Sequence, residues 1–394
     1  DWLISRQRYW GAPIPIIHCP EHGAVPVPEA GLPVLLPEVE DYEPKGDGKS
    51  PLARQDAWVN TTCPTCGGPA KRETDVMDGY ACSSWYLLRY TDPKNDKQAW
   101  DPEIAKYWTP LDMYVGGDHA VAHLLYVRFW SHLFYDMGLV PTAEPVKKLV
   151  YHGLIAAEDG HKMSKSLGNV VDPLEVIDAG YGADTLRVFL LFLGPINDNS
   201  SWSSKGIAGI YRYLSRVWNL THEYIDSDKA GEAAHDVELR TATHKLIKKV
   251  TDDYYRLSFN TAIAAMMEYV NDLYKLKVDG FSSEQWKFAF ESLARLLSPM
   301  APHIASELWL ELGNDSRLED AGWPEYDEKY LIADTMMIIV QVNGRLRAKL
   351  NVSSGMSEDD IKAQALADKN VVKYVVGEPK KVIYVKNKLV SIVV

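Results

Sequence analysis

The chain has 394 residues, of which 46% are hydrophobic and 24% are charged, as in soluble globular proteins. This length predicts two to three domains. The net charge of −12 argues against nonspecific binding to nucleic acid, and every apolar run is shorter than the roughly 18 residues that a membrane-spanning helix needs. Four cysteines in so long a chain do not resemble a secreted disulfide framework. We therefore expect a cytoplasmic protein that does not enter a membrane.

The first 15 residues combine an amphipathic helical turn ending at Gly11 with an extended stretch bounded by Pro13 and Pro15. The chain begins at Asp1 rather than Met, and directly in this patterned segment. We therefore expect it to be a piece of a longer protein.

Two short cysteine motifs follow, Cys19-Pro-Glu-His22 and Cys63-Pro-Thr-Cys66. Each pair can bind one metal ion through a tight turn, and three cysteines with one histidine are a standard closed tetrahedral zinc set. A C-x-x-C pair can also be a redox motif or two buried thiols. The two motifs together favour a structural zinc site, in which four protein ligands leave no open position for catalysis.

Residues 113–137 predict a strand that leads into a long amphipathic helix. Gly116 and Gly117 at the end of this strand allow a ligand to approach the carboxyl edge of a parallel sheet. His119 and His123 are four residues apart and share one helix face, either as a metal pair or as a packed, hydrogen-bonded pair. Residues 149–158 predict a further buried strand.

The stretch at residues 161–169 reads His-Lys-Met-Ser-Lys-Ser-Leu-Gly-Asn. Two lysines, two serine hydroxyls and a glycine suit a loop that closes over a polyphosphate, because ammonium groups stabilise the charge that develops as a phosphoanhydride breaks. The GxxxxGK[ST] pattern of a P-loop does not occur here. A solvated basic turn is the alternative interpretation.

The remainder of the chain changes from helices to strands. Residues 201–312 have a helical period throughout, which predicts a helical bundle, and Ser282 with Gln285 predicts a capping box. Residues 336–342 predict a strand, Asn343-Gly344 a hairpin turn, residues 345–350 the returning strand, and residues 357–367 a helix capped by Ser357. Residues 381–385 and 389–394 predict a second strand pair, which completes a small α+β domain.

This last segment is also basic, with 10 Lys and Arg against 5 Asp and Glu over residues 336–394. Arg345, Arg347 and Lys349 alternate along one strand, as phosphate contacts would. A solvated strand face is the alternative.

Residues 162–166, Lys-Met-Ser-Lys-Ser, are the five-residue KMSKS signature of class I aminoacyl-tRNA synthetases. The opening DWLISRQRYW resembles the segment that re-enters the catalytic domain after the editing insertion in leucyl, isoleucyl and valyl members of this family. Residues 74–93, the Gly-Gly-Asp-His string at 116–119 and VQVNGRLRAKL at 340–350 resemble the leucyl-type members. The resemblance extends from Asp1 to Val394.

The resemblance implies a multidomain fold that combines α/β, all-α and small α+β parts. Residues 1–200 correspond to the second half of a Rossmann-type class I catalytic domain, with a zinc-knuckle insertion at about 16–72. Residues 201–334 correspond to a helical anticodon-binding bundle, and residues 335–394 to a C-terminal tRNA-binding domain of ββαββ type.

The resemblance also assigns site residues. Lys162 and Lys165 would be the catalytic lysines that contact pyrophosphate. The remaining ATP-binding residues would be Gly116, Gly117, Asp118, His152, Gly153, Leu154, Met163, Ser164 and Ser166. The amino acid would be bound by Tyr80, Ser83, Tyr114, His119 and His123, and tRNA by Arg345, Arg347 and Lys349. The zinc ligands would be Cys19, His22, Cys63 and Cys66.

The implied reaction is the ATP-dependent activation of leucine to leucyl-adenylate and its transfer to tRNA(Leu), with Mg²⁺ accompanying ATP. The His-Ile-Gly-His signature, the other phosphate-binding half of a class I site, does not occur in these residues. The chain would therefore need the missing N-terminal half, in the same polypeptide or as a separate subunit. The alternative is a catalytically silent tRNA-binding or regulatory paralogue.

Overall fold

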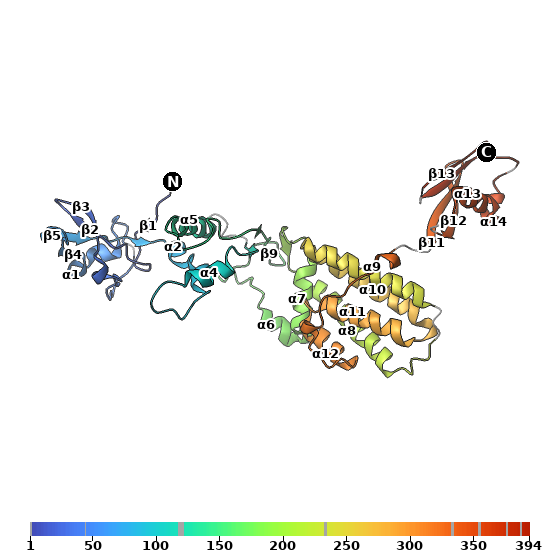
Figure 1. Ribbon diagram of the computed structural model, residues 1–394, viewed down its shortest axis with the longest axis horizontal. Helices are drawn as coiled ribbons and strands as arrows, with labels where there is room; N and C mark the ends of the chain where they lie inside the picture. The colour runs from blue at the N-terminus through green and yellow to red at the C-terminus, as the bar shows by residue number, and fades with distance from the viewer. Residues whose placement is uncertain are drawn as a thin grey trace. The chain divides into compact units, whose positions relative to one another are not determined.

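The computed structural model describes residues 2–43, 45–116, 122–231, 235–331, 335–353, 356–375, 377–386 and 388–394. The chain forms two compact units, Asp1–Gly153 and Leu154–Val394, whose elements are labelled in Figure 1. No helix among the described residues is long and apolar enough to cross a membrane.

The N-terminal segment forms a short strand, β1 (Ser5–Arg6), which pairs antiparallel with β6 (Val76–Met77). The expected helical turn was therefore wrong. Pairing with residues some 70 positions away overrides the local amphipathic pattern. Gly11 lies so close to this pair that a Cβ atom would come within 2.6 Å of Val76 Cγ2, and only glycine allows this approach.

An antiparallel sheet follows, formed by β2 (Ile16–Cys19), β3 (Gly23–Pro26), β4 (Asn60–Thr62) and β5 (Pro69–Arg72) in the order β3-β2-β5-β4. The connection between its two hairpins carries η1 (Glu29–Gly31), η2 (Pro51–Arg54) and α1 (Asp56–Val59). Because β2 pairs antiparallel with β5, the turns of both hairpins lie at the same end of the sheet.

The rest of the first unit packs short helices around α5 (His123–Asp136). These are α2 (Gly79–Ser83), α3 (Tyr86–Arg89) and α4 (Pro102–Trp108). Strands β7 (Tyr114–Val115) and β8 (Leu149–Val150) form a parallel pair. The strand expected over residues 149–158 is interrupted, since β9 (Ile155–Ala156) is separate and pairs in parallel with β10 (Ser200–Ser201).

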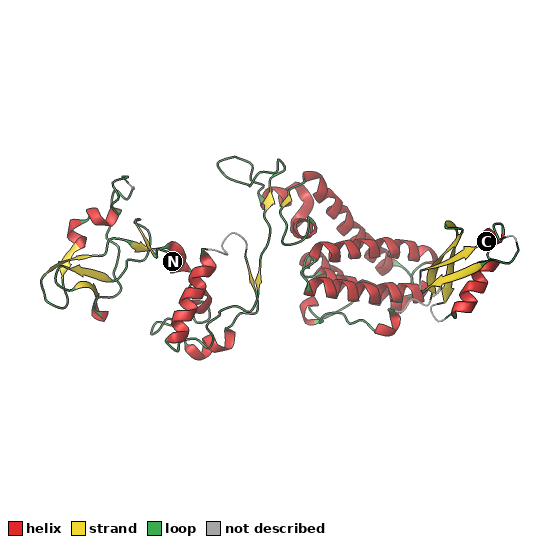
Figure 2. Ribbon diagram, turned by 90° about the horizontal axis from the view of Figure 1, so that it is seen from above, coloured by secondary structure: helices red, strands yellow, loops and turns green. Residues whose placement is uncertain are grey.

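The second unit contains a helical bundle, as the helical period predicted (Figure 1, Figure 2). Its helices are α6 (Pro173–Val176), α7 (Gly182–Phe192), α8 (Ser204–Asp226), α9 (Asp236–Tyr255), α10 (Phe259–Leu276), α11 (Ser283–Leu297) and α12 (Pro302–Glu311), with the turns η3 (Ile177–Tyr181), η5 (Lys277–Asp279), η6 (Leu318–Asp320) and η7 (Glu328–Tyr330). The predicted capping box was wrong: the Ser282 hydroxyl donates to Asp236 Oδ1 at 2.5 Å and so joins α11 to α9.

The C-terminal module comprises β11 (Thr335–Val342), β12 (Arg345–Ser353), α13 (Glu358–Ala367), α14 (Lys369–Val372), β13 (Lys381–Val385) and β14 (Leu389–Val393). The sheet order is β12-β11-β14-β13, and α13 covers one face (Figure 2). The predicted hairpin turn is confirmed, because Asn343 and Gly344 have φ angles of +47° and +77°. Ser357 caps α13, as expected, by accepting from the amide of Asp360 at 3.2 Å.

Candidate functional site

The four expected zinc ligands lie together at one end of the antiparallel sheet. Cys19 and His22 flank the turn of the β2–β3 hairpin, and Cys63 and Cys66 lie in the turn between β4 and β5. The ligand atoms of all four residues are within 4.8 Å of one another. The pairing of these four strands therefore brings two motifs separated by 40 residues into one cluster.

The spacing of this cluster fits a tetrahedral metal. A Zn–S bond of about 2.3 Å separates neighbouring ligands by about 3.8 Å. Cys19 Sγ lies 3.8 Å from Cys66 Sγ and 3.6 Å from His22 Nδ1. Although burial raises the pKa of Cys19, hydrogen bonds from the backbone of His22 and Glu21 outweigh it, so the pKa is lowered and the metal-binding thiolate is favoured.

A second group of predicted residues surrounds His123, the buried first residue of α5. The Tyr114 ring stacks on the imidazole with centroids 5.8 Å apart, and its hydroxyl lies 3.3 Å from His123 Nδ1. Tyr80, at the start of α2, forms a T-shaped contact with the same imidazole, with ring centroids 6.3 Å apart. Gly116 directly follows β7, and its amide donates to the carbonyl of Val150 at 3.0 Å. Gly117, Asp118 and His119 lie outside the residues that the structure describes.

Tyr86 belongs to this group and was missed in the sequence. Its ring lies 5.5 Å from that of His123, and burial together with the Tyr114 hydroxyl raises its pKa. The signal available was its place in the Ser-Ser-Trp-Tyr string. Ser83 lines a hollow of about 470 Å³ with Gly79, Cys82, Leu36 and residues 10–12.

Three predicted ATP-binding residues follow β8. His152 Nδ1 lies 2.9 Å from the carbonyl oxygen of Gly153. The amide of Leu154 donates to Asn199 Oδ1 at 2.8 Å, just before β10.

The predicted phosphate loop is an ordered turn built on its own serines and on Asn169. Asn169 Oδ1 accepts from the amide of Ser164 at 2.8 Å, and Asn169 Nδ2 donates to the carbonyl of Lys162 at 3.3 Å. The hydroxyls of Ser164 and Ser166 are 2.7 Å apart. The turn closes at Gly168, whose φ of +65° suits glycine.

This loop is attached to the bundle at its base. Met163 packs against the bundle core, whereas Lys162, Lys165 and Ser166 are exposed. The amide of Ser204, at the start of α8, donates to Glu158 Oε1 at 3.2 Å. The loop thus exposes the side chains of Lys162, Lys165 and Ser166 from a base that is attached to the bundle. Two ammonium groups with a neighbouring hydroxyl are a suitable arrangement for binding phosphate oxygens.

Asn169 is the positioning residue that sequence reasoning overlooked. The notable feature of the stretch was its pair of lysines, and Asn169 stood only at its end. No neighbouring residue in the sequence indicates the role of an asparagine that follows a glycine. Its two hydrogen-bond partners lie five and seven residues back along the chain.

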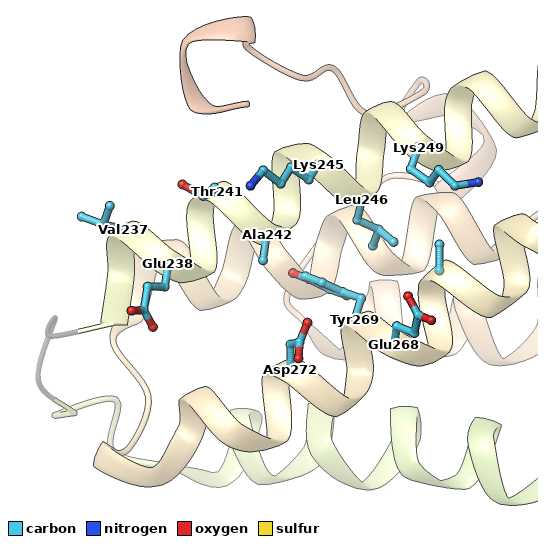
Figure 3. Close-up of a pocket in the computed structure, with 11 residues that line it drawn as sticks. Val237, Glu238, Thr241, Ala242, Lys245, Leu246, Lys249, Glu268, Tyr269 and Asp272 are labelled. Atoms are coloured by element: carbon cyan, nitrogen blue, oxygen red, sulfur yellow. The ribbon is translucent and has the colours of Figure 1, made fainter. Parts of the chain in front are cut away.

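A groove of about 470 Å³ lies between α9 and α10, with Leu246 and Tyr269 in its floor (Figure 3). Lys245 lies on its α9 side, and Glu268 and Asp272 lie on its α10 side (Figure 3). Because these charges are mixed, the groove lacks the uniformly positive potential that would attract phosphate groups.

The predicted tRNA-binding strand departs from regular alternation. Leu346 pairs with Gln341 and Ala348 with Val340, so Arg347 occupies a bulge. Its guanidinium lies 3.6 Å from the ring centroid of Tyr374, whereas Arg345 and Lys349 are exposed. The three cations therefore do not present one uniform row.

Comparison with known proteins agrees with these features. Residues 1–203 match the family described as tRNA synthetases class I (I, L, M and V). Residues 236–362 match the anticodon-binding domain of tRNA ligase.

Leucine–tRNA ligases of Dehalococcoides mccartyi and Herpetosiphon aurantiacus are 49% and 48% identical to this chain, each covering all of it. The LeuRS of Agrobacterium radiobacter K84 agnB2, solved as a ternary complex with tRNA and LeuAMS, superposes with a TM-score of 0.82 at 38% identity and covers all of this chain. The chain covers 48% of either ligase and 52% of the solved chain, about half of each. Its fold is that of a class I synthetase with a helical anticodon-binding domain, and the chain belongs to the class I tRNA synthetases of the isoleucyl, leucyl, methionyl and valyl group.

Proposed function

We propose that this chain forms part of a leucyl-tRNA synthetase and supplies the KMSKS half of its active site. In the reaction, a carboxylate oxygen of leucine attacks the α-phosphorus of ATP, the bond to pyrophosphate breaks, and leucyl-adenylate forms. The leucyl group then passes to the terminal ribose of tRNA(Leu). The observation that carries the proposal is the ordered Lys162–Ser166 loop in a chain similar to leucine–tRNA ligases throughout.

Lys162 and Lys165 act on the pyrophosphate that leaves. Their ammonium groups neutralise negative charge as the phosphoanhydride bond breaks, which lowers the barrier without a general base. Met163 anchors the loop, and Ser164 and Ser166 orient it through their paired hydroxyls. Gly116, Gly117, Asp118, His152, Gly153 and Leu154 are the other proposed ATP contacts, and Mg²⁺ would supply further neutralisation of the phosphates.

The proposed leucine pocket is the aromatic group around His123. Tyr80 and Tyr114 place apolar ring surface next to a buried imidazole, which suits a branched aliphatic side chain. Ser83 and His119 complete the proposed set.

We propose that Cys19, His22, Cys63 and Cys66 hold a structural Zn²⁺, since their spacing fits a tetrahedral ion. The ion would join the two hairpin turns across the β2–β5 pair. With four protein ligands it would have no open position, so its contribution would be to folding.

We propose domain bounds of 1–200, 201–334 and 335–394. The bundle and the basic C-terminal module would contact tRNA, with Arg345 and Lys349 on phosphates and Arg347 held at Tyr374. We propose that the protein works in the cytoplasm. The chain would depend on the rest of the synthetase for the His-Ile-Gly-His half of the site, and similarity to ligases over its whole length favours this function over a silent paralogue.

The test is leucine-dependent exchange of pyrophosphate into ATP by this chain alone and by the chain mixed with a supplied N-terminal half. We expect activity only in the mixture, and a loss of about 10²–10³-fold in Lys165→Ala, as for removal of one preorganised charge-stabilising group. Lys205→Ala, an exposed lysine outside the loop, is the matched control. Silence in the mixture, with tRNA binding intact, would overturn the proposal.

A further inference from the structure

Residues 323–330, in the connection between the helical bundle and the C-terminal module, contact one face of α9. We call residues 323–330 the aromatic strap, because they contain Trp323, Tyr326 and Tyr330. The strap ends in the turn η7, which contacts α9 (Figure 1). Its partners on α9 are spaced three or four residues apart, as expected for one helix face: Arg240, His244, Lys248 and Thr251.

The first half of the strap contacts the C-terminal end of α9. Trp323 Nε1 donates to Thr251 Oγ1 at 2.8 Å, and the Trp323 ring meets the edge of Tyr254 at 5.2 Å. Lys248 Nζ lies 5.6 Å from the Tyr326 ring centroid. An indole whose N–H is hydrogen-bonded and whose ring contacts another ring anchors a segment, because such ring pairs contribute stability beyond that of the area they bury.

The second half is held by His244. The imidazole stacks on Tyr330 at 4.8 Å and on Phe288 of α11 at 5.2 Å, and its Nδ1 accepts from the amide of Asp327 at 3.1 Å. The Arg240 guanidinium lies 4.4 Å from the Tyr330 ring centroid. Tyr330 therefore contacts both a ring and a cation of α9.

These contacts set where the C-terminal module joins the bundle. Strand β11 begins at Thr335, so four residues separate it from Tyr330. If the strap detached from α9, the connector between the bundle and β11 would lengthen from four residues to the twelve residues 323–334. The effective concentration of a tethered module at its binding site falls roughly as the −3/2 power of connector length. A threefold longer connector would therefore lower the effective concentration of the C-terminal module at the bound tRNA about fivefold.

We propose that the aromatic strap positions the C-terminal module for tRNA, with Trp323, His244 and Tyr330 as its positioning residues. The inference rests on the proposed function, because its ligand is the tRNA of that reaction. The strap acts on the tRNA-dependent transfer and not on activation of leucine, which needs no tRNA.

The test uses the full-length synthetase with Trp323→Ala and Tyr330→Ala together. We expect KM for tRNA to rise about fivefold, the connector-length ratio, while kcat and leucine-dependent pyrophosphate exchange stay unchanged. Tyr330→Phe, which keeps the ring against His244, is the matched control and should retain the parent KM. Inserting eight Gly and Ser residues after Leu331 leaves the strap attached, lengthens the connector equally, and should raise KM by a similar factor.

The outcomes separate the two proposals. Normal exchange with an unchanged KM in the double variant would refute the strap inference alone. A parallel loss of exchange would also refute it, because the strap would then support the fold in general. Absence of exchange in the parent enzyme would refute the proposed function, and the inference with it.

Discussion

Asn169 shows how a single side chain can organise a loop whose chemistry lies in other residues. One amide group accepts from Ser164 and donates to Lys162, so both halves of the Lys-Met-Ser-Lys-Ser string are tied to one point. The lysines can then carry charge toward solvent without having to order the backbone themselves. Positioning of this kind contributes to catalysis by paying the ordering entropy before the substrate arrives.

We expect Asn169→Ala in the full-length protein to lower leucine-dependent pyrophosphate exchange about tenfold. Two hydrogen bonds of about 0.5–1.5 kcal/mol each are lost, and about 1.4 kcal/mol corresponds to one decade. Initial exchange rates at saturating ATP and leucine measure the effect. Asn351→Ala, an exposed asparagine of the C-terminal module, is the control. An Asn169→Ala rate equal to the parent would show that the loop is ordered by other contacts.

At the scale of elements, the Cys3His cluster and the aromatic strap each bring together segments that are far apart in the sequence. The Cys3His cluster lies where two hairpin turns meet through paired strands. The strap has little regular structure of its own and packs against one face of the long helix α9. Both depend on side chains that are spaced to match a partner element.

We expect one zinc ion per chain, lost in Cys63→Ser. Zinc content by mass spectrometry and thermal unfolding measure the change, with a lower unfolding temperature in the variant because metal binding is coupled to folding. Cys82→Ser removes the cysteine outside the cluster and should keep the full zinc content. Equal zinc in Cys63→Ser and the parent would show that the cluster is not the metal site.

The strap contact at His244 predicts a pH dependence. Burial lowers the pKa of His244 below 6.5, with Arg240 and Lys329 acting in the same direction and Asp327 opposing them. The unfolded chain therefore takes up this proton first as the pH falls, so stability decreases from about pH 6.5 down to the lowered folded pKa. The protonated ring would also lose its acceptor at Nδ1 for the Asp327 amide.

Unfolding temperatures of the chain between pH 7.5 and 5 measure this effect. We expect the decrease below pH 6.5 to be smaller in His244→Phe, which keeps the ring stack but cannot take up a proton. His161→Gln changes an exposed histidine and should follow the parent curve. Parallel curves for His244→Phe and the parent would contradict the assignment.

At the scale of the whole molecule, the described residues form several cores that share few members. The core of the C-terminal module consists only of residues after 337 and includes Ile338, Leu350, Ile361 and Val390. The bundle core is built from helices α6 to α12 with partly buried side chains such as Met163 around it. The loop at residues 162–169 is thus coupled to the bundle, whereas the C-terminal module has a core of its own.

We expect residues 335–394 to fold alone, and the full-length enzyme without them to keep pyrophosphate exchange but to lose tRNA affinity. A module of 60 residues with a separate core is small but sufficient for folding. Circular dichroism of the isolated module and KM for tRNA of the truncated enzyme test the two parts. Loss of exchange on truncation would show that the module supports the catalytic part.

The sequence by itself determined the features that rest on local signals. The helical period of the bundle and the Asn343-Gly344 hairpin were readable, because a helix face and a turn depend on neighbours within a few residues. The Cys3His ligand types and the KMSKS string were also readable as chemistry. That the four ligands form one cluster, and that the KMSKS string forms one ordered loop, was only an expectation.

The tertiary structure decided whatever depends on contacts between distant residues. It replaced the helical turn at residues 1–10 by β1, turned Ser282 toward Asp236, and placed Arg347 in a bulge over Tyr374. It also brought Tyr86 to His123 and the strap to α9. In each case a strand partner, a buried ring or a hydrogen-bonding group far along the chain outweighed the local preference, and such partners are not visible in the pattern of neighbouring residues.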